Sequence, residues 1–161
     1  MTAFYKTIGI LLALTTSSVA QGKTEWEFTE ETDPFTDTVS YGAIKLADNY
    51  VGGIFFACEP GAPLGAGIFW GKDISSDDEK ETEVQIRVGE NPAFNMVLPV
   101  SINAASIIED GGAEILEKLL TQTGSSNMMI ARTTGDLESG FVEIDLNGLE
   151  LIAEQLDQHC S

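Results

Sequence analysis

The sequence has few positively charged residues. Among its 161 residues, 8 are lysine or arginine and 26 are aspartate or glutamate, so the formal net charge is −18. Nucleic acids and anionic lipids repel such a chain, and we expect neither as a ligand. The charge fits a solvated coat that keeps an exported protein dispersed, adaptation to a salty habitat, or a basic protein partner drawn in by the field.

The sequence also has only one histidine, His159. It adjoins Cys160, and neighbouring helical residues point about 100° apart, so the two do not form a nucleophile and its base. A Ser-His-Asp triad would need this same histidine, which lies close to the end of the chain. We therefore expect no enzyme activity, no catalytic residue and no cofactor.

No hydrophobic run is long enough to cross a membrane, because a span needs about 20 apolar residues. The first residues instead have the pattern of a signal peptide, with Lys6, an apolar stretch from Thr7 to Thr16, and the small residues of Ser17 to Ala20. We predict a signal peptide over residues 1–20, cleavage near Ala20, and a single exported β-rich domain over residues 21–161, periplasmic or secreted.

Cysteine is scarce, with Cys58 and Cys160 alone in the chain. Two thiols in one small exported domain usually pair, so we predict a disulfide between them. A structural zinc site would need about four nitrogen or sulfur ligands, and two cysteines with one histidine are too few. The disulfide would hold a C-terminal helix against a strand.

Several segments alternate apolar and polar residues with the period of a strand. At the start of the domain, Trp26 and Phe28 alternate with Glu25 and Glu27, and Pro34 then indicates a turn whose aspartates can bond nearby backbone N–H groups. Further strands are expected within residues 38–47, 52–58, 66–71, 84–89, 94–108 (one or two, with Pro99 at an edge or bend), 127–135 and 140–146.

Two segments have the spacing of amphipathic helices. The first, residues 110–124, ends at a glycine. The second, residues 147–160, has Asn147 as its predicted N-cap, and Cys160 continues its apolar stripe four residues after Leu156. The pattern predicts a mainly β (α+β) fold: an antiparallel sheet or sandwich of about seven strands with two packed helices.

An acidic segment from Lys72 to Glu83 is expected to be an exposed loop. It contains Asp77 and Asp78 and alternates like the start of a calcium-binding loop. It lacks the glycine expected at the sixth position of such a loop, and its twelfth position is Val84 rather than a glutamate. We therefore expect no metal site here.

Three segments together resemble a known family. They are Trp26 followed by "TDPFTDTVSY" (Thr32 to Tyr41), the apolar "GGIFFAC" (Gly52 to Cys58), and the closing pattern from Phe141 to Cys160. In these features the sequence resembles periplasmic accessory proteins of the bacterial type VI secretion system, the VasI/TagO-like family. The resemblance implies a non-enzymatic periplasmic protein that assists the assembly or regulation of an envelope machine.

The expected function is therefore that of an exported binding or accessory protein with a protein partner. The candidate partner-binding residues are Trp26, Asp33, Asp37, Asp77 and Asp78. One alternative is an acidic secreted inhibitor or immunity-type protein that binds a basic enzyme. Another is a carboxylate-based hydrolase, which would need two converging acids among the many in the chain.

Overall fold

The computed structural model describes residues 25–48, 51–71, 81–101, 104–107, 111–124, 126–134 and 141–161. The predicted signal peptide and the acidic residues Asp77 and Asp78 lie outside these ranges. No helix within them is both long and apolar enough to cross a membrane.

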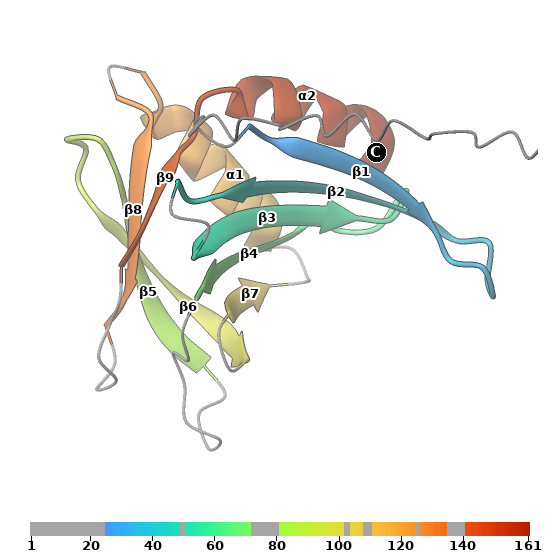
Figure 1. The fold of residues 1–161 in the computed structure, drawn as a ribbon, viewed down its shortest axis with the longest axis horizontal. Helices are drawn as coiled ribbons and strands as arrows, with labels where there is room; N and C mark the ends of the chain where they lie inside the picture. Colours follow the sequence, from blue (N-terminus) through green and yellow to red (C-terminus); the bar gives the residue numbers. More distant parts are fainter. Residues whose placement is uncertain are drawn as a thin grey trace, which may run out of the picture.

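Nine strands form one antiparallel sheet, and two helices pack on it (Figure 1). The order across the sheet is β1-β2-β3-β4-β7-β6-β5-β8-β9. The mainly β fold class is thus confirmed. The elements are β1 (Glu27–Thr32), β2 (Val39–Leu46), β3 (Gly52–Cys58), β4 (Gly65–Trp70), β5 (Glu81–Val88), β6 (Phe94–Ser101), β7 (Ala104–Ile107), α1 (Gly111–Gln122), β8 (Met128–Thr133), β9 (Phe141–Asp145) and α2 (Leu149–Cys160).

The single apolar stretch of residues 94–108 provides two strands, β6 and β7. Residues up to Pro99 of β6 pair with β5, whereas Val100 and Ser101 pair with β7. Pro99 therefore lies where the strand changes neighbours, which fits the predicted bend rather than the predicted edge.

The core lies on the sheet face that the helices cover. Alternate residues of each central strand point into it, and in β5 these are Thr82, Val84, Ile86 and Val88. α1 packs against β4 and α2 against β2, while β9 lies close to β3. A β-carbon added to Gly52 would come within 2.7 Å of Val142, so glycine allows β3 and β9 to approach.

The predicted disulfide between Cys58 and Cys160 is present. The two α-carbons are 5.7 Å apart and the cysteines are separated by 102 positions in the sequence. The N–H of Gly61 also donates to the carbonyl oxygen of Cys160 at 3.0 Å. The last turn of α2 is therefore attached to the end of β3 by a covalent bond and to the turn that follows β3 by a hydrogen bond.

The prediction that Asn147 caps α2 is wrong. Gly148 occupies the N-cap position with a φ of 89°, and no side chain caps the helix. Asn147 instead donates to Asp145 through its backbone N–H (3.1 Å) and its side-chain amide (3.0 Å). These bonds keep Asn147 in the turn after β9, and the left-handed backbone that follows suits glycine.

Candidate functional site

The turn between β1 and β2 is held by Asp33, as the aspartates of this segment were predicted to do. Its Oδ1 accepts hydrogen bonds from the backbone N–H groups of Phe35 (2.7 Å) and Thr36 (3.3 Å). The N–H of Asp37 donates to the Asp33 carbonyl at 2.9 Å, and Asp37 has a φ of 57°. We call residues 33–37 the hairpin tip.

Phe35 is the most exposed large apolar residue in the described ranges. Its side chain is 94 % exposed. Pro34 precedes it, and the aspartates on either side face solvent. An isolated exposed apolar residue is ordinary on a protein surface, but this one lies on a hydrogen-bonded turn that extends beyond the sheet (Figure 1).

The hairpin tip carries negative charge over a wide pH range. The N–H of Phe35 donates to the Asp33 carboxylate and lowers its pKa below the ordinary value of 3.8, and Thr36 contributes in the same direction. Glu31 and Glu59 line the same hollow at the base of the hairpin. A partner of this surface would therefore meet the ionised carboxylate of Asp33 at neutral pH.

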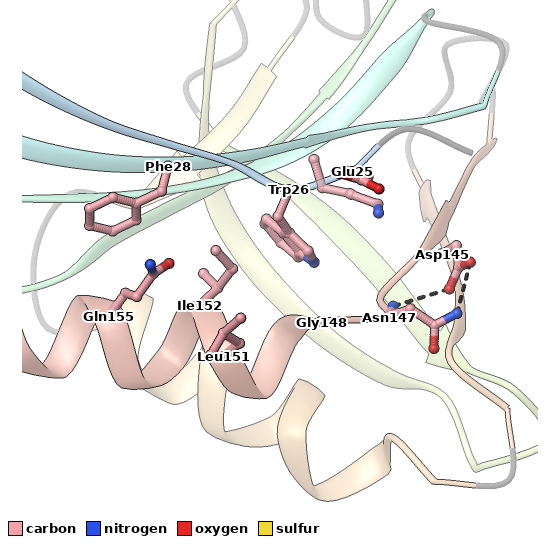
Figure 2. Close-up of a pocket in the computed structure, with 10 residues that line it drawn as sticks. Glu25, Trp26, Phe28, Asp145, Asn147, Gly148, Leu151, Ile152 and Gln155 are labelled. Atoms are coloured by element: carbon pink, nitrogen blue, oxygen red, sulfur yellow. Dashed lines mark hydrogen bonds between the residues drawn. The ribbon is translucent and has the colours of Figure 1, made fainter. Parts of the chain in front are cut away.

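A second feature is a cleft of about 600 Å³ between the start of β1 and α2, which we call the Trp26 cleft (Figure 2). It contains an aromatic and aliphatic wall together with amide and charged groups. The lining residues are Glu25, Trp26, Phe28, Lys45, Asp145, Asn147, Gly148, Leu151, Ile152 and Gln155.

Trp26 occupies a defined position in this cleft. Its ring centroid lies 6.2 Å from that of Phe56, and a β-carbon on Gly148 would be 3.4 Å from Trp26 Cδ1. Its indole Nε1 is buried and has no hydrogen-bond partner among the described residues. Burying a donor without a partner is unfavourable, so the apolar packing around the indole ring has to offset this cost and hold the ring in place.

Two charged residues of the cleft wall are buried. Lys45 is 4 % exposed and Asp145 is 6 % exposed. Asp145 accepts the two hydrogen bonds from Asn147 that shape the turn into α2. Neither residue was among the predicted candidates. Strand periodicity places Lys45 on the buried face of β2 with Ala43, whereas Asp145 directly follows the buried Ile144 and breaks the alternation of β9.

His159 lies at the far end of α2. It is exposed, and its ring stacks on Tyr41 with centroids 4.5 Å apart and lies 5.6 Å from the ring of Phe28. No group of three or more histidine, cysteine, aspartate or glutamate side chains arranged to hold a metal occurs in the described ranges.

The structure places the candidate partner-binding residues at two locations. Asp33 and Asp37 lie in the hairpin tip, whereas Trp26 lies beside the other end of β1. Phe35 was not among the candidates, although an aromatic residue after Pro34 in a predicted turn was a usable signal.

The sequence was compared with family models, curated proteins and solved structures, and none of them matches.

Proposed function

We propose that this protein is an exported, non-enzymatic binding module that contacts a protein partner through its hairpin tip. The observation that carries the proposal is Phe35, which is 94 % exposed on a turn held by the Asp33 carboxylate. Aromatic residues that enter a partner's pocket often supply a large part of the binding energy of an interface.

The geometry of the turn favours binding because the loop loses little conformational entropy when the partner binds. The hydrogen bonds of Asp33 and the left-handed backbone of Asp37 hold the loop before the partner arrives. Preorganisation of this kind lowers the entropic cost of association. The flanking carboxylates favour a partner with a basic surface and predict association that slows as salt is added.

For the cellular role, we propose assistance to an envelope assembly, with type VI secretion suggested by the family resemblance. The Cys58–Cys160 bond supports an oxidising compartment. The second candidate is an inhibitor or immunity-type protein directed at a basic enzyme. The projecting hairpin favours it, because such a loop can enter a concave active site.

The test is affinity capture from envelope extracts with the exported domain, its Phe35→Ala variant and a Phe141→Ala control. Phe141 is 66 % exposed on β9 and serves as a matched apolar surface residue. We expect the domain and the control to retain the same protein and Phe35→Ala to lose it. Equal capture by all three forms would contradict the proposal.

The two candidate roles are separated by measuring the activity of basic cell-wall hydrolases with each form added. Inhibition that requires Phe35 and weakens with salt would support the inhibitor. Capture of an envelope component without inhibition would support the accessory role.

A further inference from the structure

Strand β1 lies at one edge of the sheet. In the described part of the chain it pairs with β2 and with no other strand. An edge strand leaves alternate N–H and C=O groups available to another chain. β1 carries Glu27, Glu30 and Glu31 and no basic residue, so this edge is acidic as well as unpaired within the described ranges.

The Trp26 cleft lies beside this edge. Trp26 and Phe28 are two residues apart and both line the cleft, while Leu151 and Gln155 line it from α2 (Figure 2). Leu151 is 62 % exposed, so its side chain is accessible to a ligand in the cleft. The volume of about 600 Å³ lies within the range of ligand-binding pockets.

We propose that a basic, extended segment of a partner protein adds to β1 as a further strand and inserts an apolar side chain into the Trp26 cleft. In this mode of recognition, backbone hydrogen bonds supply affinity and a pocket for alternate side chains supplies specificity. Lysine or arginine in the segment is complementary to Glu27, Glu30 and Glu31 and to Glu25 at the rim of the cleft.

This contact is separate from the hairpin tip. Glu31 of β1 also lines the hollow at the base of the hairpin, but Phe35 does not line the cleft, so Phe35→Ala leaves the apolar contact of the cleft in place. The two proposals can therefore fail independently.

The probe is a blocked synthetic peptide in which lysine alternates with valine and phenylalanine, titrated into the exported domain by calorimetry. We expect saturable binding that weakens with salt. Leu151→Ala should weaken it about five- to tenfold, because the substitution removes an apolar wall of the cleft. The matched control is Val97→Ala on β6, since Val97 is 61 % exposed, and this variant and Phe35→Ala should bind as the parent does.

Two further peptides test the mode of binding. A peptide N-methylated at every backbone nitrogen has no backbone N–H group to donate to β1, and we expect it not to bind. A peptide with glutamate in place of lysine should also fail. Absence of saturable binding by the lysine peptide, undiminished binding by the N-methylated or the glutamate peptide, or an unchanged affinity of Leu151→Ala would each overturn the proposal.

Discussion

Removal of the Cys58–Cys160 disulfide, by the double substitution Cys58→Ala and Cys160→Ala, should lower stability by several kcal/mol. The bond closes a loop of 102 positions. In the chain-entropy model a loop of this length restricts the unfolded chain by about 4.7 kcal/mol at 25 °C. The helix itself should persist, because Leu149, Ile152 and Leu156 remain buried against the sheet.

The assay is urea unfolding followed by far-UV circular dichroism, with and without reductant. With a slope of roughly 2 kcal/mol per molar urea, the transition midpoint should fall by about 2 M. The parent in reductant should behave as the double variant does, and the double variant should not respond to reductant. A double variant within about 1 kcal/mol of the oxidised parent would refute the reasoning from loop closure.

Three further perturbations have defined outcomes. Phe56→Ala removes a fully buried ring and should cost about 3–5 kcal/mol in urea unfolding. Gly148→Ala places a side chain on a residue whose φ is 89°, and this strain should lower the free energy of unfolding by about 1–2 kcal/mol in the same measurement. Gly148→Asn should lower it less, because asparagine tolerates the left-handed conformation. The pKa of Asp33 in the folded protein lies below the ordinary value of 3.8, so the stabilisation that its carboxylate gives the turn is present above pH 3.8 and is lost as the pH falls through the folded pKa. The NMR resonance of the Phe35 amide should shift over the same pH range. A resonance that does not change with pH would contradict the hydrogen bond from Phe35 to Asp33.

Local patterns were sufficient to predict the mainly β fold, the two helices and the disulfide. The described ranges hold nine strands rather than about seven, and β5 begins at Glu81, inside the segment that was predicted to be an exposed loop. Trp26 and Phe28 alternate with glutamates, and both are half-buried in the structure. Cys160 continues the buried stripe of Leu156 and reaches Cys58. These predictions succeed because each depends on periodicity within one element or on the chemistry of a single residue pair.

The candidate sites depended on contacts between distant segments and could not be predicted in the same way. The Trp26 cleft brings together the start of β1, Lys45 of β2 and Asn147 beyond β9, and nothing in the sequence sets these side by side. The prediction that Asn147 is the N-cap of α2 failed for a related reason. Asn147 has the right chemistry for a cap, but its side-chain oxygen accepts a hydrogen bond from Asn127 Nδ2 instead, and the helix begins one residue later.

The position of the cross-link divides the chain into two parts with different freedom. Residues 58–160 form a covalent ring, whereas β1, the hairpin tip and β2 precede it and lie outside that ring. This N-terminal arm can detach at its open edge while the ring stays closed, so its amide hydrogens should exchange with solvent sooner than those of β4 and β5. The arm can also accumulate substitutions on its outer surface without altering the enclosed scaffold, and a protein built in this way can change its partner while keeping its fold.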